Sequence, residues 1–151
     1  MNAIKGFYTF LKVIAALSSI LFLVIALFLT TDAKQLQYDY DEPKSSIYGT
    51  DVVYEITPRF KYSGDVFGFE NTEIKIEIRR DSEDGELLAS DSKVINLEPN
   101  TEWSDTFFLA IDGFIFYNDS IKKYLVVSVE GDFSLISRTF ISFKAQYADE
   151  L

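Results

Sequence analysis

Apolar residues are spaced in two different ways along this chain. Residues 13–30 (VIAALSSILFLVIALFLT) form one continuous apolar run without a charge. As a helix, seventeen residues rise about 25 Å, and residues 7–11 supply the rest of a hydrocarbon core of roughly 30 Å. Because backbone groups in lipid must bond to one another, an isolated span has to be helical. The sequence therefore predicts a transmembrane helix at residues 13–30, preceded by a short cytoplasmic or interfacial segment at residues 1–12.

Beyond residue 30, apolar and polar residues alternate, which is typical of strands that bury one face. The alternation is clearest at residues 51–62 (DVVYEITPRFKY) and 73–79 (EIKIEIR). Pro58 has no N–H to donate, which predicts an edge strand or a bend at that point. Similar patterns predict further strands at residues 87–90, 93–97, 103–111, 124–130 and 138–143.

Turn signals separate these strands at Asp84-Gly85, Pro99-Asn100 and Gly131-Asp132. Seven to eight short strands at roughly ten-residue spacing predict an all-β fold, an antiparallel immunoglobulin-like β-sandwich at residues 51–151. The polar, turn-rich residues 31–50 are expected to form a stalk, with an edge strand at residues 36–40.

Charge predicts the orientation of the span. Lys5 and Lys12 precede or begin the apolar run, and no acidic residue lies in the first thirty. The positive-inside tendency then leaves the N-terminus in the cytoplasm and exports the rest of the chain as a single-pass membrane protein. Cleavage of a secretory signal after Ala33 is the competing interpretation, although the apolar run is long for a signal peptide.

Composition narrows the classes of function. The chain has 24 acidic and 14 basic residues, and without Lys5 and Lys12 the exported part carries a net charge of −12. Such a surface does not suit nucleic acid. The absence of cysteine and histidine excludes catalytic triads and metal sites built on those residues. No catalytic, cofactor-binding or metal-ligating set emerges, so the chain is expected not to be an enzyme and to need no cofactor.

Aromatic residues are the strongest sign of a binding surface. Two clusters fall in expected connections, Val66-Phe67-Gly68-Phe69 and Phe114-Ile115-Phe116-Tyr117. They either cap the sandwich core or contact a partner. The candidate contacts are Phe67, Phe69, Phe114 and Phe116, together with Ser18 and Ser19 in the span, where small residues permit close helix packing.

Two shorter patterns suggest modification or ion binding. Asn118-Asp119-Ser120 is an N-glycosylation sequon on the side expected to be exported. The acidic turn at residues 81–86 (DSEDGE) suggests calcium, but its glycine does not fall where an EF-hand loop needs it. An ordinary solvated hairpin is the favoured interpretation of that turn.

Three resemblances extend these predictions. Residues 74–78 and the segment LLASDSKVINLEPNTEWSDTFFLAI resemble membrane-anchored proteins with immunoglobulin-like or WHy-type sandwiches. Lys5-Gly6-Phe7 before an apolar stretch resembles an archaeal class III, pilin-like signal, which implies cleavage after Gly6. The span and β domain, with YEIT at residues 54–57, are also faintly similar to the non-catalytic subunit of eukaryotic signal peptidase.

The sequence thus favours a non-catalytic, membrane-anchored accessory or scaffolding subunit. Its expected partners are the lipid bilayer and other membrane or cell-envelope proteins, bound through the span and the aromatic loops. The alternative is a pilin-like filament or secretion-system subunit processed after Gly6, in which copies of the chain associate with one another.

Overall fold

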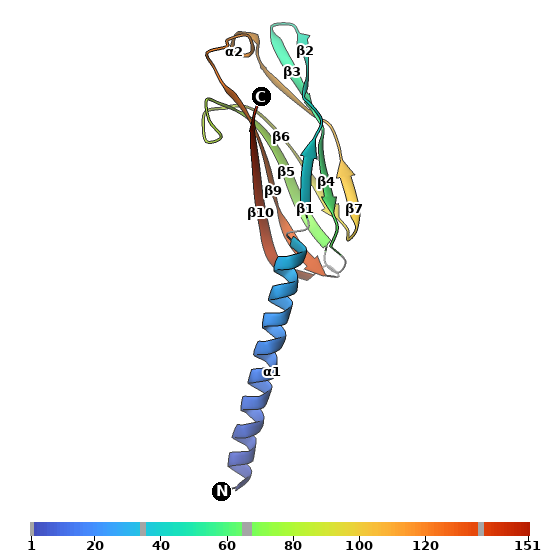
Figure 1. Cartoon of the computed structure of the whole chain (residues 1–151), viewed down its shortest axis with the longest axis vertical. Coiled ribbons are helices and arrows are strands. Elements are labelled where there is room, and N and C mark those ends of the chain that lie inside the picture. Colours follow the sequence, from blue (N-terminus) through green and yellow to red (C-terminus); the bar gives the residue numbers. More distant parts are fainter. Residues whose placement is uncertain (1, 34–35, 65–67, 136–137) are drawn as a thin grey trace.

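One long helix projects from the end of an elongated β domain (Figure 1). The computed structural model describes residues 2–33, 36–64, 68–135 and 138–151. Helix α1 (Asn2–Ala33) has 32 residues, and none of its most apolar stretch, Phe10–Leu27, is buried inside the protein. By length and composition it can cross a membrane. It extends beyond the expected 13–30 because residues 2–12 contain no proline and Lys12 is a good helix former.

Ten strands and one short helix make up the rest of the described chain. They are β1 (Leu36–Tyr40), β2 (Lys44–Tyr48), β3 (Asp51–Ile56), β4 (Pro58–Tyr62), β5 (Gly68–Arg80), β6 (Leu87–Leu97), β7 (Thr101–Ser104), β8 (Phe107–Asp112), α2 (Gly113–Phe116), β9 (Lys123–Leu135) and β10 (Arg138–Glu150).

The strands form an all-β domain of antiparallel sheets. One sheet has four strands in the order β10-β9-β5-β6 and is called the long layer here. Two three-stranded sheets, β1-β4-β7 and β2-β3-β8, follow one another along the molecule and are called the broken layer. Figure 1 shows the broken layer running beside the long one, with β2, β3 and α2 at the end farthest from α1.

The broken layer is interrupted at Thr57 and at residues 105–106. The expected strand at 51–62 is therefore two strands, β3 and β4, which belong to different sheets. Pro58 is the first residue of β4, where its missing N–H costs no interior ladder bond, so the expected bend is confirmed. The expected strand at 103–111 divides in the same way, and the Thr57 and Thr106 hydroxyls share a hydrogen bond of 3.0 Å.

A single hydrophobic core joins the two layers, as the period-two pattern predicts. Strands β3, β5 and β9 each contribute alternate buried residues to it, as does β8 on the broken side. In the first three strands these residues are Tyr54 and Ile56 of β3, Ile74, Ile76 and Ile78 of β5, and Leu125, Val127 and Val129 of β9.

Much of the segment expected as a stalk at residues 31–50 is part of the sheets. Strand β1 pairs with β4 and is the edge strand expected at residues 36–40. Strand β2 pairs with β3, although all five of its residues are exposed. Strand β1 begins three residues after α1 ends, so the sequence between helix and sheet is short.

Candidate partner-binding site

Helix α2 lies at the end of the domain opposite α1, against the turn that joins β2 to β3 (Figure 1). Asp112 caps it, because its carboxylate accepts a hydrogen bond of 2.8 Å from the Phe114 N–H. The Gly113 N–H donates to the Thr50 carbonyl at 3.0 Å. A Cβ on Gly113 would stand only 2.6 Å from that carbonyl oxygen, so only glycine fits here. The aromatic residues of α2 therefore have a fixed position.

Apolar side chains gather at this end of the molecule. Phe114 is 77% exposed and Tyr117 is 63% exposed, while on the neighbouring edge strand Ile47 and Tyr48 are 68% and 81% exposed. These four residues are called the distal tip. Hydrogen bonding between Gly113 and Thr50, and pairing of Tyr48 with Asp51, place β2 and α2 at the same end of the sheet. Large apolar side chains exposed together are typical of surfaces that bind a partner.

Of the aromatic residues predicted to contact partners, Phe114 is exposed as expected, but two others pack against rings of the protein itself. Phe116 is partly buried and its ring lies 5.5 Å from the Tyr54 ring. Phe69 is 1% exposed and packs edge-on against Tyr62, so its prediction as a partner contact is wrong. The reason is that Phe69 lies within β5 rather than in a loop. Phe67 lies outside the described residues.

Sequence reasoning missed Ile47 and Tyr48 as exposed apolar residues, and it included Tyr117 in an aromatic cluster without naming it as a candidate contact. Ile47 and Tyr48 have ordinary strand composition and would be expected to alternate between inside and outside. They are exposed because β2 is a short edge strand, with β3 on one side and no described strand on the other. The nearby Gly49, at φ +67°, was the available signal that these residues lead into an exposed turn.

Ser18 and Ser19 lie on the exposed surface of α1. The Ser19 hydroxyl donates a hydrogen bond of 2.9 Å to the Ala15 carbonyl, one turn earlier. This bond satisfies the hydroxyl within the helix, which suits an apolar environment. Both serines fall within the stretch that is long and apolar enough to span a membrane.

Asn118 lies in an open hollow beside the distal tip. The hollow is also lined by Thr50, Phe114, Tyr117 and Ser120, among others. The side-chain amide oxygen of Asn118 accepts a hydrogen bond of 3.0 Å from the Ser120 N–H, which closes a local turn through the sequon. The amide nitrogen that would carry a glycan is not used by this bond.

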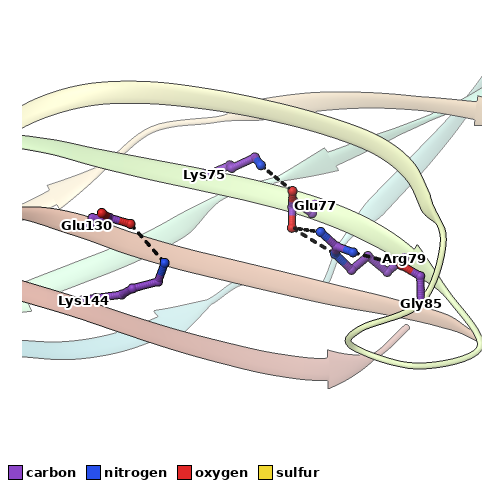
Figure 2. A network of polar contacts seen from close by, with 6 residues as sticks. All are labelled: Lys75, Glu77, Arg79, Gly85, Glu130 and Lys144. Carbon is purple, nitrogen blue, oxygen red and sulfur yellow. Dashed lines mark hydrogen bonds and ion pairs between the residues drawn. The ribbon is translucent and has the colours of Figure 1, made fainter.

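A charged network lies on the outer face of the long layer (Figure 2). The Glu77 side chain is only 6% exposed, and its carboxylate contacts Lys75 at 2.5 Å and Arg79 at 2.8 Å. Burial alone would raise the Glu77 pKa, but hydrogen bonds and charge from these two cations outweigh it and hold the pKa below its usual value. Arg79 also donates to the Gly85 carbonyl, which ties the β5–β6 turn to the sheet.

Carboxylates elsewhere are engaged in ion pairs at the surface. Asp39 and Asp41 both contact the Arg59 guanidinium, at 2.9 and 3.1 Å, and Asp105 contacts Lys93 at 2.6 Å. The acidic turn at residues 81–86 joins β5 to β6 as a hairpin, as favoured from its sequence. In the part of the chain that the structure describes, no three carboxylates gather in a way that could hold a metal ion.

Comparison with known proteins assigns neither a family nor a function to this chain. No protein-family model and no curated protein sequence matches this chain. A β-glucuronidase of glycoside hydrolase family 2 is similar over 70% of this chain and 10% of its own, at 10% identity and a TM-score of 0.40. This chain thus spans about a tenth of that enzyme.

Two smaller solved proteins are similar over most of their length. Northeast Structural Genomics Consortium target SoR45 matches over 76% of this chain and 84% of its own, at 11% identity and a TM-score of 0.48. A protein from Archaeoglobus fulgidus matches over 75% of this chain and 98% of its own, at 9% identity and a TM-score of 0.35. Similarity this low says nothing about function.

Proposed function

We propose that this chain is a non-catalytic, membrane-anchored accessory subunit that binds a partner protein of the membrane or cell envelope through its distal tip. The observation that carries the proposal is the exposure of Ile47, Tyr48, Phe114 and Tyr117 in β2 and in or just after α2. Both elements lie at the end of the domain opposite α1 (Figure 1). If α1 is held in lipid, this end points away from the bilayer. Exposed aromatic side chains on a fixed support are the usual anchors of protein contacts.

The proposed topology puts the N-terminus in the cytoplasm and the β domain on the far side, with α1 retained as a signal anchor. The support is the pair of lysines at the start of the helix and the acidic remainder of the chain. Because the chain has no cysteine, single cysteines introduced by Asn2→Cys and Ser92→Cys can report orientation. A membrane-impermeant maleimide added to intact cells should label only the second variant. Labelling of the first alone would overturn the topology.

The strand order supports an immunoglobulin-like assignment. The sequential pieces β1–β2, β3–β4 and β7–β8 act as three bent strands, so that the chain contains seven strands, A to G. In these letters the layers are A-B-E and D-C-F-G. A constant-type immunoglobulin domain has A-B-E-D against C-F-G, which differs only in the side taken by strand D. This assignment concerns the fold and adds nothing about function.

The partner contact can be tested by photo-crosslinking from the tip. A photoreactive residue at position 114 should give one discrete adduct in native membranes, and the double variant F114S/Y117S should weaken co-purification of that partner by about 30-fold or more. Phe108→Ser is the matched control, because Phe108 is 62% exposed on strand β8 but lies outside the tip. Equal loss with both variants, or a monomer in every mild detergent, would overturn the proposal.

A pilin-like subunit cleaved after Gly6 is the second candidate. The observation in its favour is that α1 is continuous from Asn2 to Ala33, has no buried residue in its stretch Phe10–Leu27, and ends close in sequence to the first strand. Such a helix could pack beside copies of itself in a filament core. Intact-mass measurement of the native protein separates the candidates, because loss of residues 1–6 supports the filament and full length supports the anchor.

A further inference from the structure

A small pocket lies at the edge of the domain where β1 gives way to β2 and where β10 ends. Its walls are Tyr40, Glu42, Pro43, Tyr54, Glu150 and Leu151, and it is called the corner pocket. It forms because β1 and β2 pair with different strands, so the chain bends away from the sheet at residues 41–43. The pocket is distinct from the hollow beside Asn118, and the two share no residue.

Tyr54 lines the pocket and brings a hydroxyl group to it. The residue is 8% exposed, and its ring packs against Phe116. Within the part of the chain described, its hydroxyl makes no hydrogen bond, and this hydroxyl is the only polar atom of the side chain. Burial also raises the Tyr54 pKa, so the hydroxyl stays neutral. A ligand in the pocket can donate a hydrogen bond to this oxygen.

Acidic groups surround the same pocket. Glu42 is exposed and makes no ion pair among the described residues, whereas Glu150 is paired with Lys122 at 3.0 Å. Burial, followed by the charge and hydrogen bonding of Asp149, raises the pKa of Tyr40, so a further carboxylate stands beside this ring. The exported part carries −12, which attracts cations toward such a concave corner.

We infer that the corner pocket binds an arginine side chain of the partner protein. A planar guanidinium can stack on the Tyr40 ring, pair with the Glu42 carboxylate and donate a hydrogen bond to the Tyr54 hydroxyl. Each of these groups recognises a different feature of arginine, namely its face, its charge and its N–H donors. The inference rests on the proposed function in one respect, that the arginine belongs to a bound protein.

The inference can be tested without knowing the partner. The full chain in detergent micelles, with isotope-labelled tyrosine, is titrated with N-acetylarginine amide while the tyrosine ring signals are followed by NMR. N-acetylcitrulline amide is the matched neutral probe, because citrulline keeps the shape of arginine without the charge. Saturable shifts of Tyr40 and Tyr54 are expected with arginine at millimolar affinity, and the same shifts should be at least about threefold weaker with citrulline.

Two variants then test whether arginine binds in the corner pocket. Glu42→Gln should weaken the arginine titration at least about threefold, because it removes the unpaired carboxylate and leaves the fold intact. Glu102→Gln is the control, since Glu102 is an exposed carboxylate on β7, away from the pocket. Equal titrations with both probes, or equal effects of both variants, would overturn the inference. If arginine fails to bind while cross-linking from position 114 succeeds, only this inference falls and the proposed function stands.

Discussion

The two layers of the β domain are built from similar residues, but their strands differ in length and continuity. The long layer has uninterrupted strands such as β5 and β9, with 13 residues each. No strand of the broken layer exceeds six residues, and each of its three bent strands is interrupted once. Long ladders continue past local register shifts, whereas short ones end in turns and edges. Both layers supply core residues, but the ends of the broken layer supply the distal tip and, together with the end of β10, the corner pocket.

The interruptions in the broken layer have local chemical causes. Pro58 begins β4 and Pro43 stands just before β2, so neither residue occupies the middle of a strand. The Thr57–Thr106 hydrogen bond joins the two interruptions side by side. The difference between the layers shows that a sandwich can keep one core while the strands of one layer change direction and leave apolar side chains exposed.

The largest expected effect is the loss of a core side chain from the long layer. Ile76 is fully buried in β5, and Ile76→Ala should lower the free energy of unfolding by about 2–5 kcal/mol. Ile47→Ala in β2 should cost about 0.5 kcal/mol or less, because Ile47 is mostly exposed. Urea unfolding in micelles, followed by Trp103 fluorescence, measures both. Equal costs of the two substitutions would contradict the assignment of Ile76 to the core and of Ile47 to an exposed edge.

Disruption of the Glu77 network should have the next largest effect. Glu77→Gln removes the charge that Lys75 and Arg79 face, and should cost about 1.5–3 kcal/mol at neutral pH. Because the folded pKa of Glu77 lies below its unfolded value, its stabilisation is present above the unfolded pKa, near 4.5, and is lost as pH falls through the folded pKa.

The pH dependence of the free energy of unfolding provides the control for this prediction. Stability of the wild-type chain should fall between about pH 5 and 3 more steeply than that of Glu77→Gln, because the variant has no carboxylate at this site to protonate. Glu130→Gln, at an exposed ion pair with Lys144, should change the curve little. Identical slopes for wild type and Glu77→Gln would refute the assignment of a depressed pKa.

A smaller effect is expected where the two interruptions meet. Thr57→Val and Thr106→Val each remove one side of a partly buried hydrogen bond and should cost about 1 kcal/mol. The double variant should cost less than the sum of the two, because both changes break the same bond. A double-mutant cycle measures this coupling, and strictly additive costs would show that the hydroxyls do not depend on each other.

The smallest effect is expected at the edge where β6 faces the broken layer. The Lys93 ammonium contacts Asp105 at 2.6 Å and donates a hydrogen bond of 2.9 Å to the Thr106 carbonyl. It also lies 4.8 Å from the centre of the Phe107 ring. Lys93→Met should cost about 0.5–1 kcal/mol, since the side chain is partly exposed. Adding salt should shrink the difference, and an effect that persists undiminished would point to packing rather than charge.

Much of the fold follows from local patterns. The uninterrupted apolar run gives the helix, and the alternation in residues 73–79 gives a strand with the observed inner face, because side chains on a strand must alternate. The density of β-branched residues at 124–130 gives a strand that is buried on both faces. Pro58 signals the bend for an equally local reason. The candidate site was harder to predict, since Phe69 and Phe114 belong to similar aromatic clusters and only one of them is exposed.

The sequence by itself determined the apolar helix, the antiparallel β class, the acidic character of the chain after that helix and the absence of histidine and cysteine chemistry. Each of these depends on residue type and short spacing alone. Only the tertiary structure decided that Phe69 enters the core while Phe114 stays outside, that residues 51–62 divide between two sheets, and that Tyr40, Tyr54 and Glu150 meet at one corner. These outcomes depend on which distant strands pair, and strand pairing is set by the burial of the whole core rather than by any local segment.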